Sequence, residues 1–469
     1  MNIKRFPKPS LSPQQADGVF RSVSRRKSLI AKSDDAAELR GIKPNLAIKR
    51  VLKDIELEPD KEVYLRISRE SKIFVDNLKN VVKKNKVKAD VFIGGSYAKG
   101  TMPKKSCYDI DVFVRFDKKN KDISKELEKI MKEVCRKIKL SLQKVHGSRD
   151  YFKVKCGQDL VFEAIPVLKI SKIKEAENVT DLSYFHVSYI KKHLKKNKLK
   201  EVLLTKRFCE AQRVYGAESY IQGFSGYGLE CLMIAYGSFE KFLKEMIKTK
   251  EKIILDSAKH YKKKEDIKIA LNESKIQSPV VLVDPTWKER NVLAALSEDS
   301  FKRFREAAKR FVARPSKEFF EVKDIEIGKL DSVAKKVGGE FVCVSIETDK
   351  QEGDIAGTKM KKFSNFLSEQ LKRYFEVIKS DFNYGGGKIA NAYFVVKSKK
   401  EIEIRGPPLK MKKHVARFRA GHKNAFEKEG RLYAKIKVDF SAKEFLEDLK
   451  RNYGLAIRGM GIENLNILN

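Results

Sequence analysis

Two aspartates separated by a single residue open an apolar segment, in the order Asp109-Ile110-Asp111. The β-branched residues that follow, such as Val112 and Val114, predict a strand. Side chains of a strand alternate between its faces, so both aspartates project to one side and the apolar residues to the other. Two carboxylates on one face repel each other unless a cation lies between them, and Mg²⁺ prefers carboxylates together with phosphate oxygens. The spacing therefore predicts a divalent metal site.

A glycine-rich turn precedes these acids. An apolar run over residues 87–93 predicts a buried strand, which Gly94, Gly95 and Ser96 interrupt, and Lys99 follows shortly after. Backbone N–H groups and a hydroxyl in such a turn could hold a triphosphate. The alternative is a plain glycine turn between two strands beside two surface acids. The length of the pattern and its strand–turn–strand context favour the nucleotide site.

A third acid, Glu163, lies in the second of two strand-like runs, residues 151–155 and 160–167. A carboxylate in an apolar strand is costly when it has no partner. A structural salt bridge to a neighbouring lysine is one interpretation. A third carboxylate that completes a two-metal site with Asp109 and Asp111 fits better, because such a site needs one more acid from an adjacent strand.

The composition indicates a polyanionic partner. The chain has 469 residues, enough for about three domains, and a formal charge of +38. Charge alone does not separate tRNA from DNA, ribosome or an anionic membrane surface. No apolar run reaches the ~18 residues of a membrane span, and no hydrophobic signal core opens the chain. The six scattered cysteines are typical of reduced thiols, so we expect a cytoplasmic protein; the oligomeric state, including a homodimer, stays open.

Composition and periodicity divide the chain into four segments. We expect a basic flexible arm over 1–45, a catalytic domain over 46–180, a helical central domain over 181–314 and an α+β body with a basic tail over 315–469. The expected fold class is thus multidomain α+β. Helices are predicted over 122–142, over the run from Leu229 to Phe239, and after Ser297, which we expect to be a helix cap.

The last segment reads as strand, helix, strand. Glu340–Ile346 and Ala392–Val396 are predicted strands, and 358–379 is a predicted helix with apolar residues at helical spacing. This β-α-β order suggests a ferredoxin-like unit. Seven cations in the following stretch, Lys410 and Arg419 among them, alternate with His and Phe, which is typical of a phosphate-and-stacking surface for RNA, although a solvated helical face is the alternative. The five that we expect to bind tRNA are Arg405, Lys412, Lys413, Arg417 and Lys423.

The stretch GGSYAKGT followed by DID resembles the signature of the nucleotidyltransferase superfamily that includes DNA polymerase β. The segments VYGAESYIQGFSGYGLECLMIAYGSF and VDPTWKERNV, with GPP, HV and NAF near the C-terminus, narrow the resemblance to the archaeal-type (class I) CCA-adding enzymes. The resemblance runs from about residue 46 to near 450. It implies a polymerase β-like head and a tRNA nucleotidyltransferase that builds the 3′-terminal CCA from CTP and ATP without a nucleic-acid template.

The resemblance also assigns roles to individual residues. Asp109, Asp111 and Glu163 match the family's metal-binding acids, and Arg290 matches the arginine that reads the base edge. The remaining nucleotide-binding matches are Gly95, Ser96 and Lys99 in the turn, then Ser183, His186, Lys206 and Tyr215.

The implied reaction is attack of the tRNA 3′-hydroxyl on the α-phosphate of CTP or ATP, with two Mg²⁺ ions and release of pyrophosphate. The acceptor arm of tRNA is the implied partner. Two alternatives stand beside it: a poly(A) or uridylyl transferase, and a catalytically weak RNA-binding relative.

Overall fold

The computed structural model describes residues 44–118, 122–249 and 251–468. The predicted arm, residues 1–45, lies outside these residues except for its last two. Among the described residues no helix has the length and apolar character needed to cross a membrane.

A mixed five-stranded sheet forms the first part of the described chain. Its strands run in the order β1-β2-β5-β4-β3, and all neighbours are antiparallel except β2 and β5. The elements are α1 (Pro44–Lys53), α2 (Lys61–Lys84), β1 (Ala89–Ile93), α3 (Gly95–Lys99), β2 (Tyr108–Phe116), α4 (Ile123–Ile138), β3 (Leu142–Val145), β4 (Tyr151–Cys156) and β5 (Leu160–Leu168). The predicted strands over 151–155 and 160–167 are confirmed.

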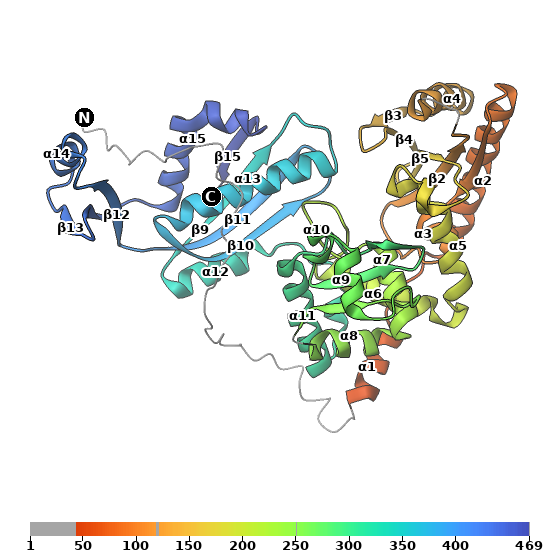
Figure 1. Cartoon of the computed structure of the whole chain (residues 1–469), viewed down its shortest axis with the longest axis horizontal. Helices are drawn as coiled ribbons and strands as arrows, with labels where there is room; N and C mark the ends of the chain where they lie inside the picture. Colours follow the sequence, from red (N-terminus) through yellow and green to blue (C-terminus); the bar gives the residue numbers. More distant parts are fainter. Residues whose placement is uncertain (1–43, 119–121, 250, 469) are drawn as a thin grey trace. The chain divides into compact units, whose positions relative to one another are not determined.

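Helices α2 and α4 pack on one face of this sheet (Figure 1). The core between them is apolar: Phe74 of α2 stacks on Phe162 of β5 with ring centroids 4.3 Å apart, and Ile110 is fully buried. The predicted helix over 122–142 is too long. It ends at Ile138 because Lys139 turns into the left-handed region, at φ 55°, and Leu142–Val145 pairs with β4 instead.

Helices dominate the central part, which also holds a small sheet of β6, β7 and β8. Its elements are α5 (Ser183–His193), α6 (Leu199–Ala211), α7 (Gly226–Tyr236), α8 (Phe239–Lys248), β6 (Ile253–Leu255), α9 (Lys264–Ala270), α10 (Glu273–Ile276), β7 (Val280–Asp284), β8 (Trp287–Asn291) and α11 (Glu298–Ala313). Ser297 caps α11 by accepting from the Ser300 amide at 3.2 Å, as predicted.

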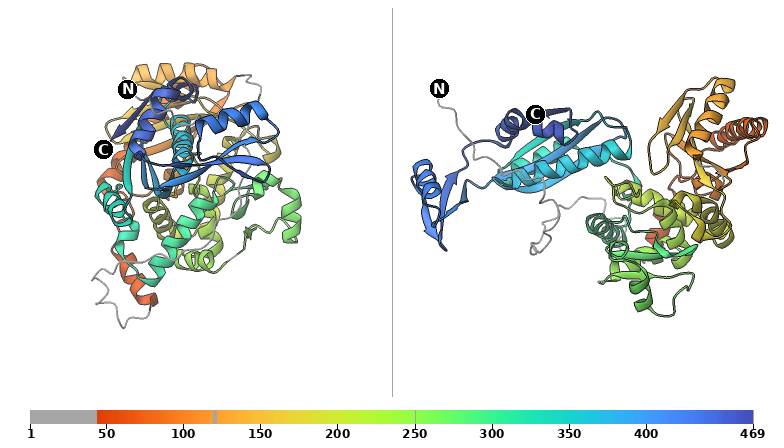
Figure 2. Two further views of the ribbon diagram at one scale, coloured as in Figure 1. Left: turned by 90° about the vertical axis from the view of Figure 1, so that its left-hand side faces the viewer. Right: turned by 45° about the horizontal axis from the view of Figure 1, so that its top comes forward.

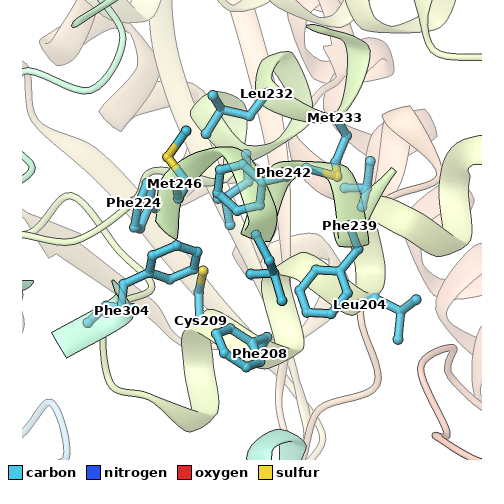
Figure 3. Packing of buried hydrophobic residues seen from close by; sticks show 14 of the residues in the cluster. Leu204, Phe208, Cys209, Phe224, Leu232, Met233, Phe239, Phe242, Met246 and Phe304 are labelled. Atoms are coloured by element: carbon cyan, nitrogen blue, oxygen red, sulfur yellow. The ribbon is translucent and has the colours of Figure 1, made fainter. Parts of the chain in front are cut away.

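The central core is rich in phenylalanine (Figure 3). Phe208 of α6 makes edge contacts with Phe239 and Phe304 at centroid distances of 5.4 and 5.7 Å. Ile48 of α1 joins this core, so α1 packs against the central helices. The predicted helix through Phe239 is two helices, because Gly237 takes φ 74° and Ser238 caps α8.

The C-terminal part is built on a βαββαβ unit, β9-α13-β10-β11-α15-β15, with an insertion between β11 and α15. Its antiparallel sheet has the order β10-β11-β9-β15, as in the predicted ferredoxin-like unit. The elements are α12 (Ile327–Val337), β9 (Glu340–Glu347), α13 (Asp354–Lys372), β10 (Phe375–Tyr384), β11 (Ile389–Ser398), β12 (Glu401–Pro408), α14 (Lys412–Gly421), β13 (Phe426–Lys428), β14 (Arg431–Lys437), α15 (Ala442–Gly459) and β15 (Asn464–Leu468).

The predicted helix over 358–379 is wrong at its end. Helix α13 stops at Lys372, and Phe375 starts β10, which pairs along its length with β11. Helices α13 and α15 pack on one face of the sheet and α12 on the other. The insertion, drawn in blue in Figure 2, is a three-stranded sheet of order β12-β14-β13 with α14 beside β12.

Candidate active site

The two aspartates lie on β2, on the face opposite α2 and α4. Asp109 is exposed and Asp111 is partly buried, whereas Ile110 between them is fully buried, which confirms the alternation. Neither carboxylate has a hydrogen-bond or ion-pair partner in the part of the chain that the structure describes. Burial, together with the nearby Glu163, raises the pKa of Asp111 to about 7. Uncompensated carboxylates of this kind suit a hard cation such as a divalent metal.

The glycine turn fits closely around Asp111. Gly95 has φ +60°, and a Cβ built there would lie 1.7 Å from Asp111 Oδ2, so only glycine fits. The turn continues as the single helical turn α3, whose first N–H groups have no partner within a helix. Ser96 and Lys99 are on this turn.

Glu163 of β5 pairs in register with Asp111 of the neighbouring parallel strand. Lys153 of β4 reaches it, with 2.8 Å between Lys153 Nζ and Glu163 Oε1. This is the ion pair of the alternative interpretation. Within the described ranges, no three His, Cys, Asp or Glu side chains come together as a metal cluster. The role of Glu163 as third ligand therefore stays a prediction.

A buried carboxylate that the sequence did not single out, Glu230 of α7, joins the first part of the chain to the central part. It is fully buried and lies 2.6 Å from Lys99 Nζ, 2.9 Å from Lys206 Nζ and 2.6 Å from Thr101 Oγ1. Burial would raise its pKa, but the two ammonium groups hold it at about 2. We name these four residues the Glu230 cluster.

Two predicted triphosphate contacts lie in or beside the Glu230 cluster: Lys206 is a member of it, and Tyr215 is a neighbour. Lys206 is buried and also donates to the Thr101 carbonyl oxygen at 2.9 Å, so its ammonium does not face solvent. Tyr215 lies nearby: a Cβ at Gly226 would meet its hydroxyl at 3.0 Å and Lys206 Cε at 3.9 Å. Burial raises the pKa of Tyr215 to about 12, so it is a neutral donor at neutral pH.

A second buried carboxylate, Asp284 at the end of β7, contacts two predicted nucleotide-binding residues, Arg290 and His186. Its Oδ2 lies 2.6 Å from Arg290 Nη1 and 3.3 Å from His186 Nε2, and Tyr227 donates to Oδ1 at 3.1 Å. Lys99 Nζ lies 5.9 Å from the Tyr227 ring centroid, so Lys99, His186 and Arg290 approach one another around Tyr227. Ser183 begins α5, the helix of His186, and α5 packs against α3.

Asp284 could have been found from the sequence, because it is the one acid at the end of an otherwise apolar strand, VVLVD. The signal for Glu230 is weaker: it is a single charge in an apolar helix. The predicted tRNA-binding cations lie apart from this site. All five are exposed, on β12, α14 and the segment after it, and none has an ion-pair partner among the described residues.

Family comparisons agree with this geometry. Residues 75–176 match the model of the nucleotidyltransferase domain, and residues 200–321 match the tRNA nucleotidyltransferase second domain. The chain is therefore a nucleotidyltransferase, with a polymerase β-like head in a multidomain α+β fold.

Curated relatives narrow the class. The chain is 33% identical over 422 residues to the CCA-adding enzyme of Nanoarchaeum equitans, covering 88% of this chain and 96% of the relative. It is 32% identical to that of Saccharolobus solfataricus, covering 67% and 72%, and 28% identical to that of Methanocaldococcus jannaschii, covering 84% and 89%. The chain belongs to the family of CCA-adding enzymes. Membership implies nucleotide substrates, a divalent metal and tRNA.

Proposed function

We propose that this protein adds C, C and A to the 3′ end of tRNA from CTP and ATP, with two Mg²⁺ ions held by Asp109, Asp111 and Glu163. The observation that carries the proposal is the pair of partnerless carboxylates on β2, packed against the glycine turn. Bound divalent cations would lower the pKa of the attacking hydroxyl and neutralise the triphosphate. Glu163 would then share its carboxylate between the metal and Lys153.

The protein's own groups bind and orient the substrates. Gly95 leaves room for Asp111 beside the turn that receives the triphosphate, and Lys99 lies at the end of that turn. Arg290 presents a planar set of donors to the incoming base. The pairing edge of C and A carries a ring-nitrogen acceptor where U and G carry a donor, so these N–H donors favour C and A. Exposed cations of the tail hold the tRNA backbone irrespective of its sequence.

The direct test supplies labelled CTP and ATP to tRNA that lacks its CCA end. The wild-type protein is expected to add two C and one A only when a divalent cation is present. Asp111→Asn should reduce addition at least 100-fold while tRNA affinity changes little, because phosphate contacts elsewhere carry the affinity.

Asp159→Asn is the matched control. It removes the same charge just before β5, where Asp159 pairs with Arg66 outside the proposed site, and should leave addition unchanged. Long homopolymers of A or U would instead support the poly(A) or uridylyl transferase alternative. Full addition by Asp111→Asn would contradict the metal assignment.

A further inference from the structure

Asp284 is a carboxylate with no exposure to solvent at the end of a strand whose five residues are all buried. A buried charge of this kind is costly unless it is paired and fully hydrogen-bonded. Five contacts satisfy it. Besides Arg290, His186 and Tyr227, the Thr286 amide and the Thr286 hydroxyl each donate to Oδ1 at 2.8 Å. These five residues are the Asp284 cluster.

One nitrogen of the Arg290 guanidinium, Nη1, is hydrogen-bonded to Asp284 at 2.6 Å, and its other N–H groups have no acceptor among the described residues. Its side chain is 22% exposed, so the remaining N–H groups reach solvent. An arginine carries five N–H donors in a rigid fork, and fixing one corner therefore fixes the direction of the others.

The same carboxylate shapes the hairpin that carries Arg290. Asp284 ends β7, and its contacts with Thr286 close the turn into β8, where Trp287 opposes Asp284. An aspartate that accepts from a residue two positions ahead is a common device for fixing a turn. The backbone position of Arg290 and the direction of its side chain thus depend on one carboxylate.

His186 and Tyr227 come from two other helices, α5 and α7. Their rings stack with centroids 4.0 Å apart, and both donate to Asp284. Donation from Nε2 means that this nitrogen carries the proton and that Nδ1 is an acceptor. Burial lowers the pKa of His186, which keeps the ring neutral. Asp284 thereby determines which donor and acceptor His186 presents.

We propose that Asp284 is a positioning residue for nucleotide selection, acting through the direction of the Arg290 fork and the tautomer of His186. The inference rests on the proposed function. Asp284 does not touch the nucleotide; it keeps the free donors of Arg290 aligned with bases that offer a ring-nitrogen acceptor, C and A. A site with fixed donors rejects bases that place a donor there, because the protein group is then left unpaired.

The test compares wild type with Asp284→Asn in single-nucleotide addition to tRNA lacking CCA. An amide replaces one acceptor oxygen by a donor, which opposes either the Arg290 and His186 donors or the Tyr227 and Thr286 donors. We expect the ratio of kcat/KM for CTP over UTP to fall about 10- to 100-fold. A purely structural role would lower kcat/KM for all four nucleotides equally and leave the ratio unchanged, which would overturn the inference.

Two further variants keep the test decisive. Asp181→Asn is the matched control: Asp181 is also buried and paired with an arginine, Arg149, so its loss should lower the unfolding midpoint without changing the ratio. Asp284→Glu replaces Asp284→Asn in the test if Asp284→Asn does not fold. It keeps the negative charge but shifts its position, so we expect a folded protein with a lower CTP-over-UTP ratio. The double variant Asp284→Asn/Arg290→Lys should lose less selectivity than the sum of the two single losses, because both changes share the path through Arg290; strictly additive losses would contradict that path.

A second readout does not depend on addition. Trp287, the single tryptophan, lies in the same hairpin and is the fluorescence probe that we choose for a CTP titration. We expect CTP to bind Asp284→Asn at least tenfold more weakly than wild type. If wild type adds no C or A, the proposed function fails, and this titration still decides the role of Asp284. Equal CTP affinity in wild type and Asp284→Asn would overturn it.

Discussion

Replacing Glu230 by glutamine should destabilise the protein strongly, because it removes the negative charge shared by two enclosed lysines. Glu230 is fully buried, and the side chains of Lys99 and Lys206 are 9% and 2% exposed. The pKa of Glu230 is about 2 instead of the usual 4.5. Since one pKa unit corresponds to about 1.4 kcal/mol, this difference contributes roughly 3 kcal/mol to the free energy of unfolding at pH 7. Breaking a buried ion pair costs a similar ~3–5 kcal/mol.

The measurement is urea unfolding followed by Trp287 fluorescence, since this tryptophan lies in the central part with Glu230. At pH 7 we expect the free energy of unfolding of Glu230→Gln to be about 3 kcal/mol lower than that of wild type. Glu240→Gln, which removes a surface partner of Lys244 on α8, is the control and should change stability by less than about 0.5 kcal/mol.

The pH dependence has a definite sign. A carboxyl whose pKa is depressed in the folded state contributes stability above its unfolded pKa and loses it as the pH falls towards the folded value. The difference between wild type and Glu230→Gln should therefore shrink below about pH 4.5. An equal unfolding free energy for the two proteins at pH 7, or a difference that grows in acid, would refute the reasoning.

The remaining predictions concern the third acid and the tail. Glu163→Gln should lose most addition activity while Glu163→Asp stays active, measured with labelled CTP; a fully active Glu163→Gln would leave Glu163 as the structural partner of Lys153. Replacing the exposed Lys412, Lys413 and Arg417 with Ala should weaken binding of all tRNAs alike and make the slope of log affinity against log salt shallower by roughly 0.9 per lost contact with duplex. An unchanged slope would mean that α14 is only a solvated face.

Sequence patterns correctly predicted the features that depend on residues close together in the chain. The alternation around Ile110, the cap at Ser297 and the strands around Glu163 follow from side chains within a few residues, and all are confirmed. The predicted helix over 358–379 is wrong at its end because Tyr374 and Ile378 continue the apolar spacing of a helix. Residues on both sides of Ile378 pair with β11, a separate segment, and this pairing makes the end of the predicted helix a strand.

The contacts of the site depend on pairing between distant segments. Lys206 and Arg290 were singled out from the sequence, but their buried partners, Glu230 and Asp284, were not. Glu230 lies 24 residues from Lys206 and 131 from Lys99, and Asp284 lies 98 residues from His186. No periodicity connects residues so far apart. The roles that the sequence assigns to the metal-binding and nucleotide-binding residues therefore stay predictions. The structure adds the buried residues that contact them.

The insertion between β11 and α15 leaves the body and returns to it at adjacent residues. The Val438 amide donates to the Lys400 carbonyl oxygen at 2.7 Å, so the chain departs after β11 and returns before α15 at adjacent residues. The βαββαβ order of the body is the same with or without the 37 intervening residues, 401–437. Insertions whose ends meet in this way are tolerated without rethreading the host domain. In evolutionary terms, this insertion can be lengthened, exchanged or lost in relatives while the body keeps its strand order.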